Sequence, residues 1–395
     1  MPLAWLFATA FAADWPLLQG SEAGRPDVPV SVGGFVQVDL EAGLRNGALA
    51  DLPDPLADHD GQLPLFNTSP SPQLYVRRVR PMLRGSIPGS DQRVSWLVMA
   101  ELGQSSTTRT SPVVLTDASI TLTATPWFQV RLGRFKLPVM EEALESNPIA
   151  AQLIAFSEPA RALVMENPVR DGAYTGGANG FRDVGIEVFG TQRWGSAAVS
   201  GQLMVSNGGR EVDGWYDVTG RVQVAWLFSS ATTDPHRDEI GLTAWHQQGH
   251  RTLDGAPALR VREGLGVQVD RGPVHARAEV VHAVGAIERA PELPGQPVVV
   301  EADGHAAGGV VEASVRWWRL VGAARWAGLW TDPGAVDARV QHTATFGLRW
   351  HPFAKAHLEV DYERRWQAAP NDGAAAQQVV AAQGDRVLGS VTVVF

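Results

Sequence analysis

Cysteine is absent from the 395-residue sequence, and lysine is nearly absent. The lack of cysteine excludes disulfide frameworks, thiolate metal sites and cysteine nucleophiles together. Of the 33 basic residues only Lys136 and Lys355 are lysines, and the formal net charge is −9. Basic residues form no continuous run that would neutralise a nucleic-acid backbone, so we expect no nucleic-acid partner.

Long hydrophobic runs are missing as well. No stretch reaches about 18 uninterrupted apolar residues, so the sequence predicts no transmembrane helix. A short apolar run over residues 2–12 ends in Ala10-Phe11-Ala12, a pattern typical of a signal-peptidase site. We predict a signal peptide over 1–12, truncated at its start because a basic region is missing, and a periplasmic N-terminal segment over 13–29. The alternative is a disordered or buried N-terminus.

From Val30 onward the dominant hydrophobic period is two. In the first segment Val36, Val38 and Leu40 alternate with Gln37, Asp39 and Glu41. Such segments run for roughly 10 to 13 residues, the length that a tilted strand needs to cross a bilayer. They lie near 30–44, 73–87, 92–104, 113–125, 126–136, 182–191, 195–207, 216–228, 238–250, 258–270, 272–284, 306–318, 319–331, 341–351, 354–367 and 384–395. Sixteen segments fit the even strand count of an outer-membrane barrel.

The connections between the segments alternate between long and short. Residues 45–72, 137–181 and 285–305 are long, whereas Thr125-Pro126 and Trp318-Arg319 are tight. This alternation is typical of extracellular loops and periplasmic turns, with 229–237 as the one poor fit. We therefore predict an all-β, antiparallel up-and-down transmembrane barrel over residues 30–395. A soluble β-protein also alternates, and it would bury the apolar face under a second sheet.

The last segment ends in Phe395, with Val387, Val391 and Val393 on the same face. A terminal aromatic residue after alternating apolar positions is similar to the signal that the barrel assembly machinery reads. Several tryptophans also lie near predicted strand ends, as in aromatic girdles at the two membrane interfaces. The alternative for the ending is a C-terminal strand in a soluble sheet.

Arginines recur on the polar face, which looks into the lumen of a barrel. We expect Arg78, Arg80 and Arg84 on the second segment, together with Arg131 and Arg221, to line the pore and select anions through charge-assisted hydrogen bonds. The second segment carries these three without an acid beside them in the sequence. The alternative is that each arginine pairs with a carboxylate on a neighbouring strand and stiffens the wall.

The long connection 137–181 is a candidate constriction loop. A helix is predicted from Glu141 to Leu163, followed by a glycine-rich stretch over 172–180. A loop of this length can fold into the lumen and narrow it. There Arg134, Lys136, Arg161 and Arg170 would face Glu141, Glu142 and Glu145 in a transverse field. The alternative is an extracellular cap.

At this point the chain resembles the phosphate-selective porin family, of the O and P type. The residues that carry the resemblance are Val76-Arg77-Arg78-Val79-Arg80 with Gly85, Leu132-Gly133-Arg134-Phe135-Lys136-Leu137-Pro138 followed by Glu142, Ser146 and Asn147, and the ending from Asp385 to Phe395. The resemblance implies a sixteen-stranded homotrimer in outer-membrane lipid. It also implies that basic lumen residues favour small anions such as phosphate.

The function that we expect is passive diffusion, with no cofactor, no metal and no enzymatic step. His246, His282 and His357 occur singly, and the chain has neither an H-E-x-x-H nor a G-x-S-x-G motif. Residues 176–180 are glycine-rich but follow no strand of a βαβ unit, so a phosphate-cradling role is not expected. Two alternatives stay open: an outer-membrane barrel enzyme, and a soluble periplasmic β-protein that binds a ligand or partner.

Overall fold

The computed structural model describes residues 30–44, 72–91, 93–108, 111–145, 148, 151–167, 169–170, 173–174, 177–208, 216–228, 238–253, 255–289, 299–332, 338–368 and 384–395. The predicted signal peptide and the segment 13–29 lie outside the described residues, as does nearly all of the first long connection. Among the described residues, no helix is long and apolar enough to span a bilayer.

Sixteen antiparallel strands form one closed barrel, with each strand paired to its neighbours in chain order and the last paired to the first. They are β1 (Val30–Leu44), β2 (Gln73–Ser86), β3 (Val94–Leu102), β4 (Val113–Thr125), β5 (Phe128–Lys136), β8 (Arg182–Trp194), β9 (Ala197–Ser206), β10 (Asp217–Leu227), β11 (Glu239–Leu253), β12 (Ala256–Arg271), β13 (Val274–Val284), β16 (His305–Trp317), β17 (Leu320–Thr331), β18 (Arg339–Phe353), β19 (Ala356–Ala368) and β20 (Asp385–Val394). The barrel prediction is confirmed, and each predicted segment corresponds to one strand.

The period-two alternation places polar side chains inside the barrel and apolar side chains outside. On β10, Asp217, Thr219 and Arg221 are buried in the interior, whereas Val222 and Val224 are exposed on the outer wall. Exposed aliphatic side chains recur in this way around the barrel. Hydrocarbon is the surrounding that makes such a surface stable, because water would leave this apolar area unburied.

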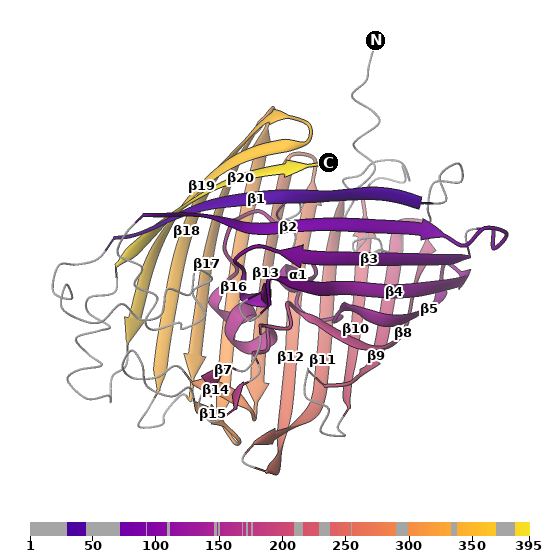
Figure 1. Ribbon diagram of the computed structural model, residues 1–395, viewed down its shortest axis with the longest axis horizontal. Coiled ribbons are helices and arrows are strands. Elements are labelled where there is room, and N and C mark those ends of the chain that lie inside the picture. Colours follow the sequence, from indigo (N-terminus) through magenta and orange to yellow (C-terminus); the bar gives the residue numbers. More distant parts are fainter. Residues whose placement is uncertain are drawn as a thin grey trace.

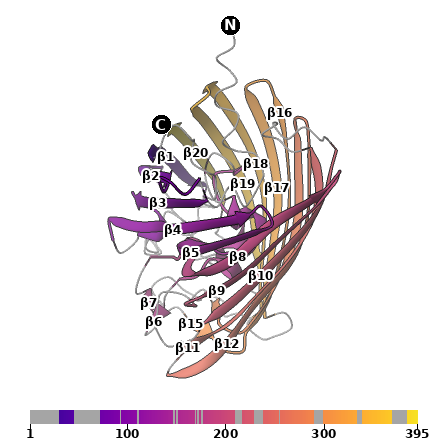
Figure 2. The ribbon, with the colours of Figure 1, turned by 90° about the vertical axis from the view of Figure 1, so that its right-hand side faces the viewer.

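Figure 1 shows β1 to β5 crossing in front of the strands of the back wall at a steep angle. Strands on opposite walls of a barrel cross in this way because every strand tilts from the barrel axis, typically by about 35–45°. Figure 2 shows the back strands, from β10 to β19, as one curved and twisted wall. Right-handed strand twist curls a sheet of this size until its edges meet, so no edge strand is left unpaired.

Short turns lie at one end of the barrel, which we call the short-turn rim: β4 and β5, β8 and β9, β12 and β13, β16 and β17, and β18 and β19 are each joined by two residues there. The other end is the long-loop rim. Two connections depart from the predicted alternation. Residues 228–238 are long for the short-turn rim, and β11 ends at Leu253 only two residues before β12 begins at Ala256, on the long-loop side. The β11–β12 ladder is 15 pairs long, so this hairpin itself extends past the rim.

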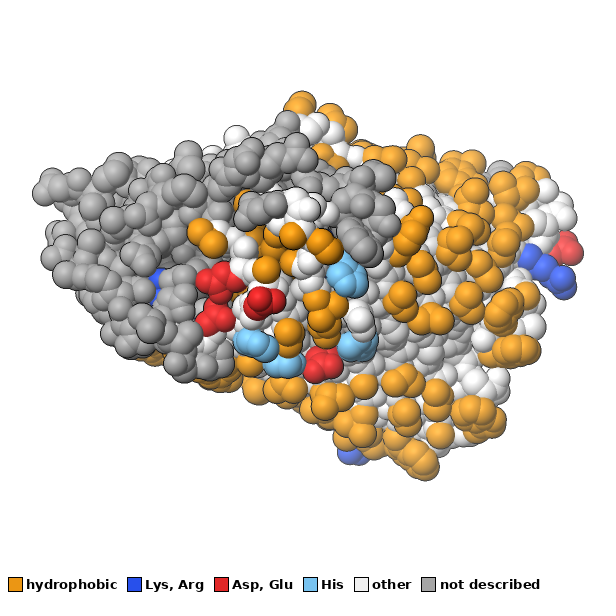
Figure 3. All heavy atoms as spheres, turned by 90° about the horizontal axis from the view of Figure 1, so that it is seen from below, with side chains coloured by type: hydrophobic (Ala, Val, Ile, Leu, Met, Phe, Trp, Pro, Cys, Tyr) orange, Lys and Arg blue, Asp and Glu red, His pale blue; other side chains and the backbone are white. Residues whose placement is uncertain are grey.

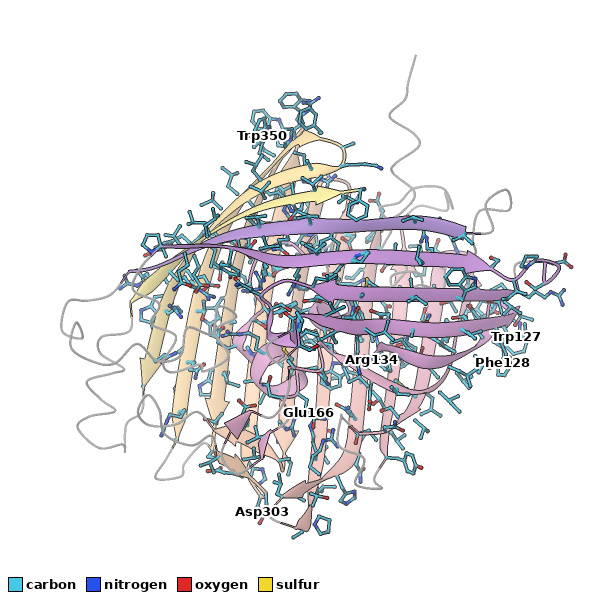
Figure 4. The ribbon with its side chains drawn as sticks, viewed as in Figure 1. Trp127, Phe128, Arg134, Glu166, Asp303 and Trp350 are labelled. Atoms are coloured by element: carbon cyan, nitrogen blue, oxygen red, sulfur yellow. The ribbon has the colours of Figure 1, made fainter. Side chains whose placement is uncertain are left out.

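Exposed aromatic side chains gather at the short-turn rim. They are Trp127, Phe128, Trp194, Phe228, Trp317, Trp318, Trp350 and Phe353. In Figure 4, Trp127 and Phe128 mark one point of this rim and Trp350 another. Amphipathic rings favour the headgroup level of a bilayer, so this ring of side chains is an interfacial girdle at one membrane surface.

Small elements occupy the connections. They are η5 (Ser106–Thr108), α1 (Glu141–Leu144), the π-helical turn η6 (Ala160–Val164), and the two-stranded pairs β6 (Val169–Arg170) with β7 (Ala173–Tyr174) and β14 (Ile287–Arg289) with β15 (Val299–Glu301). Of these, α1 and η6 lie inside the barrel, where they determine the geometry of the lumen.

Candidate channel interior

The described residues of 137–181, here called the inserted segment, leave the wall at β5 and cross the interior. The first part contacts the wall through two arginines, one three strands from β5 and one on the opposite side of the barrel. Arg221 on β10 donates to the carbonyl of Val139 and to the carboxylate of Glu141. Arg325 on β17 donates to Glu142 at 3.0 Å and to the carbonyl of Ala155 at 2.9 Å. Since β5 and β17 lie on opposite sides of the barrel, the segment spans the lumen.

The middle of the inserted segment is held by the strands on either side of the barrel closure. The amide of Ile154 donates to Asp361 on β19 at 2.7 Å, and its carbonyl accepts from Arg77 on β2 at 3.2 Å. Arg349 on β18 donates to the carbonyl of Ala151 at 2.6 Å. An arginine side chain can make both contacts, because its planar guanidinium donates to a backbone carbonyl and to a wall carboxylate at the same time.

The last part of the segment returns along the wall between β11 and β13. Arg262 donates to the carbonyl of Leu163 at 2.7 Å, and Arg251 donates to Glu166 at 2.8 Å. Arg277 reaches back to Glu145 at 2.6 Å. Strands β2, β10 to β13, β17 and β18 therefore donate to one segment, and β19 accepts from it. Charge-assisted bonds of this kind are about twice as strong as neutral ones.

Two wall glycines leave room for the segment. A Cβ atom on Gly308 would lie 2.6 Å from the ring of Pro159, and one on Gly347 would lie 2.5 Å from Leu153. Any side chain at these positions would push the segment away from the wall. This close packing indicates that residues of the wall strands, as well as those of the segment, are adapted to the insertion.

An apolar cluster lies between the segment and the wall. Met140, Leu144 and Leu163 of the segment pack with Trp245 of β11 and Val281 of β13. The Trp245 indole donates to Glu279 at 2.7 Å, and the second oxygen of Glu279 accepts from the amide of Glu141 at 3.1 Å. Burial of these side chains stabilises the insertion, and the polar atoms beside them are hydrogen-bonded.

The helix predicted from Glu141 to Leu163 is wrong. Among the described residues of this range, Glu141–Leu144 is α-helical, residues 151–157 are not helical, and Ala160–Val164 forms a separate π-helical turn. Pro148 lies inside the predicted helix, where proline has no amide to donate, whereas Pro159 has helical dihedrals and begins the second helical turn. The short helix places Glu141, Glu142 and Glu145 on one turn, where each carboxylate pairs with an arginine of a different strand: β10, β17 and β13.

Two carboxyl groups of the segment have displaced pKa values. Burial raises the pKa of Glu145 to about 7, against the opposing attraction of Arg277. Burial acts in the same direction on Glu166, but Arg251 and Arg260 outweigh it and lower the pKa of that carboxyl to about 2. Around neutral pH the attachment through Glu145 therefore titrates, whereas the attachment through Glu166 stays ionised.

The second strand does have an acid beside its arginines, contrary to the sequence-based expectation. Glu101 on β3 accepts from Arg80 at 2.5 Å and lies 4.0 Å from Arg78. The sequence of β2 does not indicate this neighbour, because only the register between β2 and β3 places Glu101 beside Arg80. Arg84 lies nearer the short-turn rim, where it donates to Ser31 at 3.3 Å.

The remaining predicted pore residues differ in their surroundings. Arg131 is fully enclosed, 3.6 Å from Glu187 and between the rings of Phe135 and Phe189. Lys136 donates to the carbonyl of Leu144 in the inserted segment. Arg161 lies 3.7 Å from Glu158 within the segment. Only the backbone of Arg170, in β6, is described.

Arg134 departs from its expected place in the lumen. It pairs in register with Ala118 and Val184, and Val184 is exposed on the outer wall. Residues directly opposite one another share a face of the sheet, so Arg134 belongs to the outward face. Its guanidinium donates to the carbonyls of Thr116 and Asn179.

Charge is unevenly distributed around the inner wall. We call the group on β2 to β8 the basic sector: Arg78, Arg80, Lys136 and Arg182 with the carboxylates Glu101 and Asp117, which interact electrostatically with one another. Arg182 donates to Asp117 at 2.8 Å. Four cations against two carboxylates give this sector a formal charge of +2.

The opposite arc is densely paired, and its charges balance. This paired sector comprises six carboxylates and six arginines: Asp39, Glu41, Glu312, Glu359, Asp361 and Glu363 with Arg77, Arg325, Arg339, Arg349, Arg365 and Arg386. Sequence reasoning missed Arg77, Arg182 and Arg339, and it placed the other arginines of this arc in the lumen without indicating which of them lie together. Alternation identified the inward face of each strand, but no local signal indicates which strands lie opposite one another.

Within the described ranges, no group of three or more His, Asp or Glu side chains is arranged to hold a metal ion. The main features of the described interior are its ion pairs and the inserted segment.

No protein-family model matches the chain, and no curated protein matches its sequence. The resemblance to the phosphate-selective family thus stays a prediction. Solved structures do match. An anion-selective porin from Comamonas acidovorans covers 93% of this chain and 99% of its own length, with a TM-score of 0.60 and 14% sequence identity.

Salmonella typhi OmpF, solved with daunomycin, covers 93% of this chain and 97% of its own, with a TM-score of 0.57 and 12% identity. The outer-membrane channel DcaP of Acinetobacter baumannii gives the same coverage, with a TM-score of 0.56 and 13% identity. At such identities the likeness concerns the fold. This chain has the sixteen-stranded barrel fold of the porins, the architecture of a bacterial outer-membrane protein.

Proposed function

We propose that the chain is a passive outer-membrane channel that prefers small anions such as phosphate, with the inserted segment as its constriction. A closed barrel with a polar interior and an aliphatic exterior supports a water-filled path across the bilayer. The segment supports a narrowed path, since it crosses the lumen from β5 to β17 and is held from several strands. No chemical step or cofactor is part of the proposal.

The basic sector is the observation that carries the anion preference. Its formal charge of +2 lies along one side of the interior, where the Lys136 side chain donates to the inserted segment. Fixed cations lower the barrier for an anion by replacing part of its hydration with charge-assisted hydrogen bonds. Exclusion of cations from this side follows from the same field. One solved porin with this fold is described as anion-selective, in line with the proposal.

The partners that we propose are outer-membrane lipid, two further copies of the chain and the barrel assembly machinery. A solved structure of similar fold, OmpT of Vibrio cholerae, is described in a trimer form. Phe395 lies at the seam where the barrel closes: its amide donates to the carbonyl of Gly34 on β1 at 3.0 Å. The residue we propose as the assembly signal is thus also part of the final strand pairing.

The test is the reversal potential of the purified barrel in a planar bilayer under a KCl gradient. Arg78→Gln with Lys136→Gln removes both surplus cations of the basic sector, and we expect the chloride-to-potassium permeability ratio to move toward 1. Glu101→Gln should move the ratio the other way. Lys355→Gln removes a cation at the short-turn rim and is the matched control. A wild-type channel that prefers potassium, or equal ratios in all variants, would contradict the proposal.

A further inference from the structure

Three titratable side chains form a row on the outer wall, which sequence reasoning treated as single histidines. His246 on β11 is directly opposite Glu263 on β12, and Glu263 is directly opposite His282 on β13. Nδ1 of His282 lies 3.0 Å from one carboxylate oxygen of Glu263, and Nδ1 of His246 lies 3.4 Å from the other. All three side chains are about half exposed. We call them the imidazole row.

The outer wall is aliphatic on the short-turn side of the row and mixed on the long-loop side. Toward the short-turn rim, Leu242, Leu265 and Val280 are exposed on the three strands. Toward the long-loop rim, Gln248 and His250 on β11 and His305 at the start of β16 share the face with Leu259 and Val261 of β12. Figure 3 shows histidine and acidic side chains gathered beside the hydrophobic surface of the barrel. The imidazole row therefore marks a chemical boundary on this wall.

The height of the row fits the outer face of the membrane. His246 is seven residues beyond Glu239, and His282 is eight residues beyond Val274, counted from the short-turn ends of β11 and β13. At the rise and tilt of barrel strands this is roughly 20 Å along the axis, which places the row in the outer part of an apolar band of about 25 Å. The cost of a charged side chain falls from the midplane toward the interface, and the half-exposed rings lie within about 5 Å of the headgroup level.

An aromatic group continues the boundary on the next strands. Ala307 is opposite both His282 and Trp330, which places Trp330 at the same height as the row. Trp330 and Trp326 lie on either side of His342, with ring centroids 5.3 and 5.5 Å away. The wall beneath them is Gly328, where a Cβ atom would lie 2.7 Å from Trp330. Indoles favour the boundary between acyl chains and headgroups.

We propose that the imidazole row binds the phosphorylated glycolipid headgroups of the outer leaflet. Each ring turns Nδ1 toward Glu263, so Nε2 points away from the carboxylate. A neutral ring that donates from Nδ1 presents Nε2 as an acceptor, and only the protonated ring donates from Nε2 to a phosphate oxygen. Glu263 lies between the two rings and holds both in this orientation.

Protonation reverses the charge of the row. With both rings neutral the row carries the single negative charge of Glu263, and with both protonated it carries a single positive charge. The nearest titratable side chains on the same face are His250 on β11 and His305 on β16, with Asp303 in the turn before β16. Because only the protonated rings donate to phosphate, phosphate binding should be stronger at pH 6 than at pH 8.

The test measures binding of diphosphoryl lipid A and of its dephosphorylated form to the full-length barrel in detergent, at pH 6 and pH 8. Diphosphoryl lipid A should bind about fivefold more tightly at pH 6 than at pH 8, as expected for charge-assisted bonds at a half-exposed site. The pair His246→Gln and His282→Gln should remove this difference. The pair His246→Arg and His282→Arg should bind tightly at both pH values, and Lys355→Gln should behave as wild type.

Equal binding of the two lipids, or unchanged binding by the double glutamine variant, would overturn the proposal. An upward shift in the apparent size of the barrel after heating checks that each variant is folded. Reversal potentials of the same variants, measured in bilayers without lipid A, should equal that of the wild type. The two measurements therefore test the lipid site and the proposed channel function separately.

Discussion

The attachment between Glu142 and Arg325 is the most informative place to perturb the inserted segment. Both side chains are buried, and the guanidinium also donates to the carbonyl of Ala155. Glu142 further accepts from the amide of Ser157 at 2.8 Å and from its hydroxyl at 2.5 Å. The pair thus connects α1, the start of η6 and the wall strand β17 through one carboxylate.

Arg325→Met keeps the length of the side chain and removes the charge. Leaving one partner of a buried ion pair without the other costs about 3–5 kcal/mol. If the whole cost opposes insertion, even the lower figure makes release of the segment more than about 100-fold more frequent. Adding Glu142→Gln removes the stranded charge, so the double variant should recover much of the loss.

The absence of cysteine from the chain makes the assay simple. Ala143 on α1 is fully buried, so Ala143→Cys introduces a single thiol that reacts only when the segment is released. We expect Arg325→Met to accelerate its labelling by a polar maleimide about 100-fold and to raise single-channel conductance. An unchanged labelling rate in a folded barrel would refute the reasoning, since insertion would then not depend on this ion pair.

Two other perturbations can be checked with the same thiol. Gly308→Val should release the segment because its Cβ atom would lie 2.6 Å from Pro159, whereas Gly309→Val, with 3.9 Å to its nearest neighbour, is the matched control. Equal labelling of both would contradict the packing argument. The raised pKa of Glu145 means that the inserted state holds the proton more tightly than the released state, so insertion is strongest below about pH 4.5 and weakens as the pH rises to about 7. Labelling, corrected with an unburied reference thiol, should therefore increase about tenfold between pH 5 and pH 7.5, and Glu145→Gln should abolish that increase. A flat profile in the parent protein would rule out Glu145 as the titrating group.

The wall of the barrel could be predicted from the sequence because alternation is a local property. Whether Val222 faces lipid and Arg221 faces the lumen depends only on the period-two geometry of one strand. The same holds for the strand number and for the tight turns, and all of these predictions are confirmed. The helix prediction over 141–163 failed, because Pro148 has no amide to donate inside a helix.

What the sequence by itself determined is therefore the closed sheet and the face that each strand turns to the membrane. Only the tertiary structure decided that Glu101 neutralises Arg80, that Arg134 faces outward, and that Arg325 holds a segment that begins some 180 residues earlier. The physical reason is that an ion pair depends on register and on the path of a long connection. Neither the register nor the path of a connection produces a periodic pattern in the sequence, because charges far apart in sequence become neighbours only when the barrel closes.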